Sequence, residues 1–143
     1  MKCISIRQPW ADLIIGGVRP CETKDFEPHC AALPFPLFIH ASLEIDWAAC
    51  RRLGMLPPGV TGAVLGMVDF VRVTRPSAAE WRKLWQDHLE ANGRPYGGKT
   101  RLWFFENQRR FVEPVPFKGR LGLFDVPDEL VRDLPVMDFG GRV

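Results

Sequence analysis

The sequence lacks the features that mark zinc-binding, secreted and membrane proteins. Its four cysteines stand at positions 3, 21, 30 and 50, so no two of them form a C-x-x-C pair. No apolar run approaches the roughly 18 residues of a membrane span, and the N-terminus has no apolar signal-peptide region. We therefore expect no metal, no cofactor and no membrane partner. The same observations predict a cytoplasmic protein whose reduced thiols fill small spaces in the core.

A strong excess of charge of one sign is missing as well. The 143 residues carry 19 Lys and Arg against 17 Asp and Glu, which gives a net charge of +2. Composition therefore does not by itself indicate a nucleic-acid partner, although it is compatible with a local basic groove. Hydrophobic residues make up 46% of the chain, enough for one core. We expect one domain over residues 1–135 and a loosely ordered tail over residues 136–143.

Alternating apolar patterns predict about six strands with helices between them. The predicted strands cover residues 2–8, 19–26, 37–42, 61–73, 101–113 and 119–127. The predicted helices lie at 10–15, 44–54, 76–93 and 128–134. The strand at 61–73 is the longest and most central candidate, and the prolines of 114–118 are expected to interrupt the sheet. This order predicts an α+β fold, a small mixed β-barrel with peripheral helices.

The third predicted helix carries both a capping motif and an apolar stripe. Ser77 is followed three residues later by Glu80, the pattern of a capping box. Trp81 and Trp85 lie on its apolar stripe, so both are expected to pack against the sheet.

One stretch, "SIRQPWADLIIGGVRPCETKDF" (residues 5–26), gathers hydrogen-bonding side chains around a Gly-Gly turn. The side chains are those of Arg7, Gln8, Trp10, Arg19, Glu22 and Lys24. A hydrophobic core needs few of them, whereas a site for a planar polar ligand uses most of them.

This stretch resembles the opening motif of ASCH domains (activating signal cointegrator homology), which belong to the PUA-like superfamily. The family pattern is a strand, Q-P-W-A, an apolar helix, then G-x-K-x-x-E-x-R and an aromatic residue. Here the last part reads Gly17, Arg19, Glu22, Lys24 and Phe26, with Lys and Arg exchanged at both basic positions. "FIHAS" (38–42), "AVLGMVDFVRV" and the segment from "WFFENQ" to "FDVP" continue the resemblance over nearly the whole chain. It implies a PUA-like barrel that binds RNA, another nucleic acid or a nucleoside.

The residues and the resemblance together suggest roles around one cleft formed by the "RQPW", "ETKDF" and "FIHAS" segments. Arg19 and Lys24 would contact phosphate, and Gln8 and Glu22 would read a base edge. His40 and Ser42 would form the floor, with Arg7, Trp10 and Trp103 as further ligand candidates.

Each of these residues also has a structural interpretation. Trp10 leads an apolar stripe and Trp103 alternates with its neighbours, which favours packing for both. Glu22 and Lys24 share a strand face and could form an ordinary surface pair, and His40 could be a buried, hydrogen-bonded histidine.

A hydrolase is the second hypothesis. Some relatives hydrolyse a modified cytidine with a Lys, a Thr and a Glu, or cleave RNA. By position the triad would fall on Arg19, Glu22 and Asp69, which makes Glu22 and Asp69 the acid-base candidates. An arginine cannot act as a general base, and the adjacent Thr23 is expected on the opposite strand face.

Four further cations, Arg109, Arg110, Lys118 and Arg120, could extend a basic rim or protect a solvated edge. The sequence thus favours a module that binds RNA or a nucleotide. Hydrolysis of an N4-acylcytidine-type nucleoside or of RNA is the first alternative, and a protein-interaction module is the second.

Overall fold

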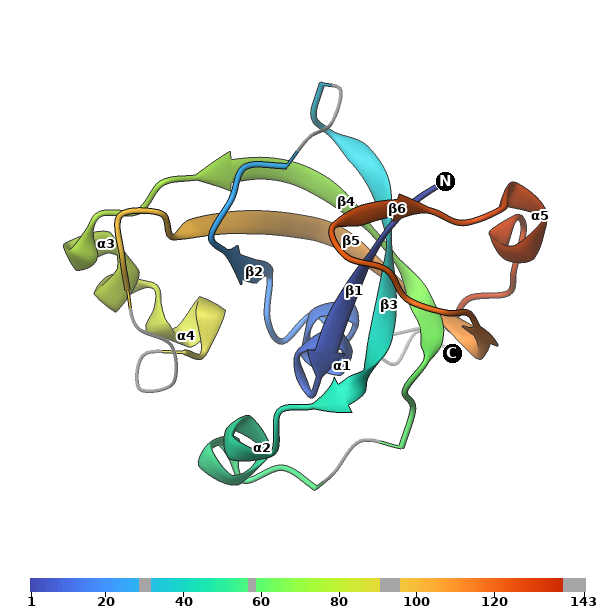
Figure 1. The fold of residues 1–143 in the computed structure, drawn as a ribbon, viewed down its shortest axis with the longest axis horizontal. Coiled ribbons are helices and arrows are strands. Elements are labelled where there is room, and N and C mark those ends of the chain that lie inside the picture. The colour runs from blue at the N-terminus through green and yellow to red at the C-terminus, as the bar shows by residue number, and fades with distance from the viewer. Residues whose placement is uncertain (29–31, 57–58, 91–95, 138–143) are drawn as a thin grey trace.

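The computed structural model of the chain describes residues 1–28, 32–56, 59–90 and 96–137. Within these ranges the chain forms six strands and five helices (Figure 1). The strands are β1 (Lys2–Gln8), β2 (Cys21–Lys24), β3 (Phe35–Ile45), β4 (Ala63–Thr74), β5 (Arg101–Pro116) and β6 (Leu123–Asp125). The helices are α1 (Trp10–Ile15), α2 (Trp47–Leu53), α3 (Ala78–Lys83), α4 (Trp85–His88) and α5 (Asp128–Val131). The predicted α+β class and strand number are confirmed.

All six strands belong to one mixed sheet, in the order β2-β5-β4-β3-β1-β6. β1 runs parallel to β3, and the other neighbouring pairs are antiparallel. β4 is central, as predicted, but β5 is longer and continues to Pro116, three residues past the predicted end of this strand and into the predicted break. β2 covers β5 only at Arg101–Phe104. The prolines at the far end of β5 therefore lie away from β2, where a missing N–H breaks no ladder with that strand.

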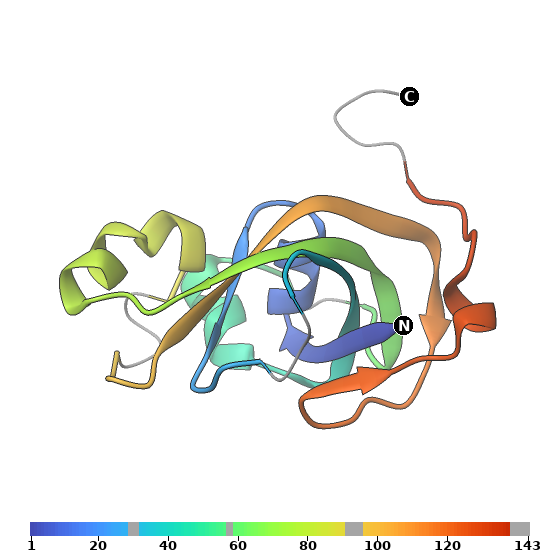
Figure 2. The same cartoon turned by 90° about the horizontal axis from the view of Figure 1, so that it is seen from above.

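The sheet curls, but its two end strands, β2 and β6, do not pair within the described part of the chain. Figures 1 and 2 show β4 and β5 as long, bent strands that arch around α1 and β1. β6 pairs only with Lys2–Ile4 of β1. The second half of β1, residues 5–8, is thus left beyond the reach of β6. We call the opening between this half of β1 and β2 the seam.

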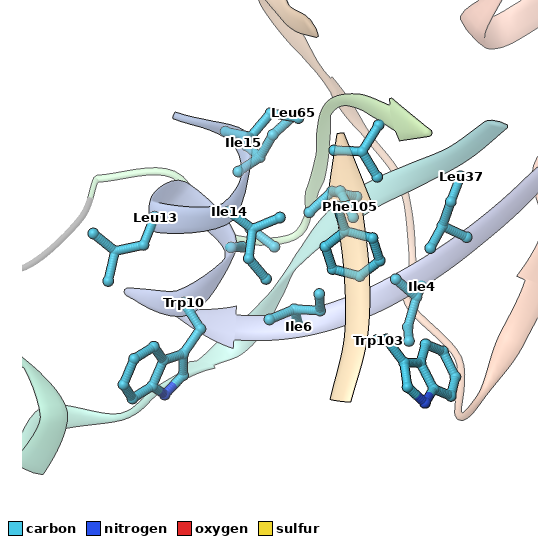
Figure 3. Close-up of a cluster of buried hydrophobic side chains, with 14 of the residues drawn as sticks. Ile4, Ile6, Trp10, Leu13, Ile14, Ile15, Leu37, Leu65, Trp103 and Phe105 are labelled. Carbon is cyan, nitrogen blue, oxygen red and sulfur yellow. The ribbon is translucent and has the colours of Figure 1, made fainter. Parts of the chain in front are cut away.

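Helix α1 fills the concave side of the sheet. It packs against β1, β3, β4 and β5. Trp10 and Ile14 of α1 are buried together with Trp103 and Phe105 of β5 (Figure 3). The helix ends at the Gly-Gly turn, as predicted, where Gly17 adopts a φ of +80° that favours glycine.

The helix predicted over residues 76–93 is divided. The capping box of Ser77 and Glu80 is present, but α3 ends at Lys83 and α4 is a separate single turn. His88 stacks on the buried Trp81, with ring centroids 3.7 Å apart. Trp85 is 52% exposed, so the prediction that it packs inside is wrong. The break between α3 and α4 turns His88, instead of Trp85, toward the core.

The cysteines behave as the sequence predicts where the structure describes them. Cys3, Cys21 and Cys50 are free and buried, and Cys30 lies outside the described residues. Burial raises the pKa of Cys3 and of Cys21 to about 12, so both thiols stay protonated and fill space.

At the C-terminal end, Val136 forms a bridge with Phe111 of β5. Met137 donates its N–H to the carbonyl of Arg110 at 2.7 Å, and residues 138–143 of the predicted tail lie outside the described residues. Among the helices of the described chain, none combines the length and the apolar character needed to cross a bilayer.

Candidate functional site

Two adjoining hollows open at the seam. The inner cavity, about 310 Å³, lies between β1, β2, the start of α1 and Glu90. The outer groove, about 880 Å³, lies between β1, the end of β3 and the segment 117–122 that links β5 to β6. Ser5, Arg7, Lys24 and Phe26 line both hollows, which makes them one continuous surface. The open edge of the curled sheet is therefore where a ligand can reach the interior.

A buried arginine anchors the inner cavity. Arg19 has no exposed surface, and its guanidinium forms a salt bridge with Glu22. Its Nη2 donates to Glu90 at 2.6 Å and to the Thr23 hydroxyl at 3.3 Å, while its Nε donates to the carbonyl of His88 at 2.8 Å. Arg19 thus ties β2 to the segment after α4. It lies beneath the site and not at a phosphate-binding rim, where the sequence places it.

Trp10 lies against this arginine. The guanidinium carbon of Arg19 is 4.4 Å from the centre of the indole ring, and the indole N–H donates to Asp46 at 3.1 Å. Only 3% of Trp10 is exposed, so the packing interpretation is confirmed. Trp10 is nevertheless one of the residues that line the inner cavity.

Glu22 forms an ionised floor in the inner cavity. Burial would raise the pKa of Glu22, but the charges of Arg19 and Lys24 and the hydrogen bonds from Arg19 and the Thr23 N–H lower it below its ordinary value. Lys24 Nζ lies 3.9 Å from the second carboxylate oxygen. The predicted Glu22–Lys24 pair therefore exists, but it lines a cavity and Glu22 is only 8% exposed.

Thr23 also borders the inner cavity, although sequence reasoning excludes it. Strand alternation does place Thr23 and Glu22 on opposite faces of β2. However, β2 is an edge strand, and Arg19 contacts both side chains at this edge. A basic group, a hydroxyl and a carboxylate therefore meet as Arg19, Thr23 and Glu90.

Asp69 lies elsewhere and lines neither hollow. Its carboxylate accepts hydrogen bonds from Arg109 at 2.7 Å and Asn107 at 3.1 Å. These partners account for a carboxylate in the central strand. Glu22 lines the inner cavity and Asp69 does not, so the predicted acid pair does not share a cavity.

Gln8 is buried, and its side-chain amide hydrogen-bonds to the backbone of two different segments. Its amide nitrogen donates to the carbonyl of Val60 at 2.9 Å, and its oxygen accepts from the N–H of Asp12 at 3.0 Å. Gln8 lines neither hollow. Because both ends of the amide are engaged, the predicted base-edge role is replaced by a role in positioning α1.

His40 fixes one wall of the outer groove. Its Nε2 lies 2.6 Å from the carbonyl of Phe117, which can only accept, so Nε2 carries the proton and Nδ1 accepts from the Ser5 hydroxyl at 2.9 Å. Burial lowers the pKa of His40, although the Phe117 carbonyl opposes this shift. The interpretation of His40 as a buried, hydrogen-bonded histidine is confirmed. Together with Ser42 it also lines the groove.

The outer groove combines cations with exposed apolar surface. Its cations are Arg7, Lys24, Lys118 and Arg120, and its lining contains one carboxylate, Glu44. Its exposed apolar side chains are Phe26, Leu43 and Leu121, exposed by 44%, 79% and 99%.

Of the four cations proposed for a rim, only two lie at the groove. Lys118 and Arg120 line it, whereas Arg109 pairs with Asp69 and Arg110 pairs with Asp12 outside it. These two pairs agree with the alternative interpretation, in which the charged side chains protect a solvated edge of the sheet.

Trp103 supports the site from within the core. It is fully buried, stacks on Phe70 with ring centroids 5.0 Å apart, and donates its indole N–H to the carbonyl of Phe26 at 3.4 Å. Trp103 therefore holds Phe26 in place, and Phe26 is the aromatic residue that lines both hollows.

Sequence reasoning missed Glu90, His88 and the position of Phe26 at the site. Glu90 and His88 lie about 70 residues from Arg19, near the end of the helix predicted over residues 76–93, whose capping motif and apolar stripe indicate packing and no ligand site. Only Phe26, the aromatic residue that ends the ASCH-like pattern, carries a sequence feature that could have identified it. The described residues contain no group of three side chains placed to hold a metal ion.

Comparison with known proteins agrees with this fold. No family model matches the sequence. The solved ASCH protein of Zymomonas mobilis superposes with a TM-score of 0.66 at 12% identity, over 90% of this chain and 88% of that protein. Two single-residue variants of that protein, a Tyr-to-Phe and a Ser-to-Ala substitution, each align with a TM-score of 0.57 at 12% identity. Each alignment covers 90% of this chain. It covers 91% of the Tyr-to-Phe variant and 89% of the Ser-to-Ala variant. The fold implied by the ASCH resemblance is therefore confirmed.

Proposed function

We propose that this chain, which has the fold of an ASCH protein, binds single-stranded RNA at the seam between β1 and β2. The observation that carries the proposal is the outer groove. Four cations, from β1, β2 and the segment 117–122, surround exposed apolar side chains from three parts of the chain. Single-stranded nucleic acid matches both features of the groove, because its phosphates attract cations and its bases pack on apolar or aromatic side chains.

The inner cavity adds a place for one base beside the groove. Its volume, about 310 Å³, is at the lower end of the range for small-molecule sites. Glu22 and Glu90 are hydrogen-bond acceptors there, so a base that presents an amino group fits better than one that presents only carbonyl oxygens. A duplex would hide this edge, which favours an unpaired strand.

The residues then take revised roles. Arg7, Lys24, Lys118 and Arg120 contact phosphates, Phe26 packs on a base, and Glu22 accepts from its edge. His40 and Ser42 form the floor of the groove. Arg19 and Gln8 position Glu22 and α1 from beneath.

Fluorescence anisotropy with labelled single-stranded RNA, duplex RNA and DNA tests this proposal. We expect Lys118→Ala to weaken binding of single-stranded RNA about fivefold. We also expect the slope of log K against log salt to become shallower by about 0.7, the value for one lost phosphate contact on a single strand. Lys83→Ala is the matched control, because Lys83 is an exposed lysine that lines neither hollow.

Equal behaviour of Lys118→Ala and Lys83→Ala would contradict the proposed groove. Absence of binding to any nucleic acid would reject the function and leave the protein-interaction alternative.

The contact between Arg19, Thr23 and Glu90 favours a second candidate function, hydrolysis of an acylated nucleoside in the inner cavity. Thr23 and Glu90 contact the same guanidinium nitrogen, which places a hydroxyl nucleophile close to a carboxylate that can take its proton. Turnover of an N4-acylcytidine, measured by chromatography, would establish this activity. Thr23→Val should then abolish turnover while leaving RNA binding in the outer groove unchanged.

A further inference from the structure

Beyond the seam, two arginines converge on one carboxylate oxygen. Glu27 Oε1 accepts a hydrogen bond from Arg75 Nε and another from Arg101 Nε, each at 2.8 Å. The hydrogen bond from Arg101, followed by that from Arg75, lowers the pKa of Glu27. The two guanidinium groups therefore already hold an anion, and that anion comes from the protein itself.

This cluster is continuous with the proposed RNA surface. Arg101 is the direct partner of Lys24 in the β2–β5 ladder, so their side chains lie on the same face of the sheet. Lys24 lines both hollows, and Phe26, which precedes Glu27, also lines both. A strand that leaves the seam along the end of β2 would meet Arg101 and Arg75 next.

The cluster is organised to hold an anion at one position. Arg101 is only 17% exposed, and its Nη1 donates to the carbonyls of Gly98 at 3.1 Å and Thr100 at 3.0 Å, which fixes its guanidinium. Glu27 and Arg75 are 44% and 71% exposed. Because an exposed ion pair contributes little to stability, a phosphate that offers several oxygens to two guanidinium groups can replace this carboxylate.

We propose that Arg75 and Arg101 bind the phosphodiester of a nucleotide beyond the groove, and that Glu27 occupies this phosphate position until nucleic acid displaces it. The inference rests on the proposed RNA-binding function and extends it by one site. It makes Glu27 an internal competitor that lowers affinity for strands long enough to reach the cluster. A strand confined to the hollows would not meet this competitor.

The test compares a labelled RNA dinucleotide with a labelled single strand of about eight nucleotides, a length that one small binding domain can cover. We expect Glu27→Gln to tighten binding of the longer strand about two- to fivefold and to leave the dinucleotide unchanged. Asp128→Asn is the matched control. It removes the same charge from a carboxylate of similar exposure, 48%, that also pairs with an arginine, Arg132.

The role of the arginines is tested with Arg75→Ala, and Arg132→Ala is the matched control. Both arginines are largely exposed, at 71% and 65%, so neither substitution should unfold the chain. Arg75→Ala is expected to weaken binding of the longer strand alone and to lower its salt slope by about 0.7. Arg101→Ala is less suitable, because it also removes hydrogen bonds to the backbone.

The outcomes separate this site from the proposed function. If the wild-type protein binds RNA but Glu27→Gln behaves like Asp128→Asn, the phosphate site is rejected and RNA binding stands. If the wild-type protein binds neither oligonucleotide, the proposed function fails. The site is then judged by the NMR signals of the Nε–H groups of Arg75 and Arg101 in Glu27→Gln. Shifts on titration with inorganic pyrophosphate would retain it, and unchanged signals would overturn it.

Discussion

Arg19 is the residue on which the inner cavity depends most directly. It separates two carboxylates, Glu22 and Glu90, that would otherwise face each other in a site with little access to water. The geometry of a guanidinium explains why one side chain can contact a carboxylate on each side, a hydroxyl and a backbone carbonyl together. A lysine has one nitrogen and could not make this set of contacts. The site as observed therefore depends on an arginine at position 19.

We expect Arg19→Ala to lower the free energy of unfolding by about 3–5 kcal/mol at neutral pH, because it leaves buried carboxylates uncompensated. The pH dependence follows from the lowered pKa of Glu22. In the wild-type protein the stabilisation by Glu22 is present above the ordinary pKa of a glutamate, and it is lost as pH falls through the folded-state value. The difference between wild type and Arg19→Ala should therefore shrink as the carboxylates take up protons.

Urea denaturation at neutral pH and at a pH below 4.5, the ordinary pKa of a glutamate, measures this difference. Arg132→Ala, in an exposed pair, serves as the control and should cost less than about 1 kcal/mol. A loss in Arg19→Ala that is as small as the control, or that grows toward low pH, would disagree with the buried network.

At the scale of elements, the curvature of the sheet decides that a seam exists. β4 and β5 pair with several register shifts, and Gly66 lies beside one of them. A Cβ atom at Gly66 would lie 2.1 Å from the carbonyl oxygen of Arg109 and 2.8 Å from the Cα atom of Arg110. Such irregular pairing increases the local bend and twist of a sheet. The close approach that only glycine permits thus helps to bend β4 and β5 around α1.

Gly66→Ala is expected to destabilise the fold by about 1–3 kcal/mol or more, because the contacting atoms belong to the backbone of the neighbouring strand. Gly97→Ala is a matched control, since a Cβ atom there meets nothing within 4 Å. Thermal unfolding followed by circular dichroism compares the two. Equal melting temperatures for the two variants would show that β4 and β5 accommodate the added methyl group without loss of stability, which would contradict this prediction.

At the scale of the whole molecule, the net charge of +2 does not reveal the groove. Net charge averages over the surface, and many cations of this chain lie within 4 Å of a carboxylate, as Arg109 and Arg110 do. The groove gathers four cations only because β1, β2 and the segment 117–122 meet at the seam. Two of these cations, Arg7 and Lys24, lie 3.6 and 3.9 Å from carboxylate oxygens of Asp46 and Glu22. Salt screens surface charges over about 8 Å at physiological ionic strength, so the local arrangement of charges matters more for a charged ligand than the net charge does.

Local patterns in the sequence are enough to predict most of the strands and helices, and two residues that line the inner cavity. Apolar periodicity, the capping box and the Gly-Gly turn are local features, and the strands, α1 and the cap of α3 follow from them. The ASCH-like pattern likewise marked Glu22 and Lys24, which line the inner cavity. These predictions succeeded because each depends on residues close together in the chain.

Which side chains share a cavity depends on contacts between residues far apart in the chain. Glu90 meets Arg19 across 71 positions, and His40 meets the carbonyl of Phe117 across 77. No periodicity encodes such contacts, because they arise from the curl of the sheet. For the same reason the sequence placed Arg19 at a rim and Asp69 beside Glu22. It is the packing of α1 against the curled sheet, with β2 left as an open edge, that buries Arg19 under the site and leaves Asp69 outside it.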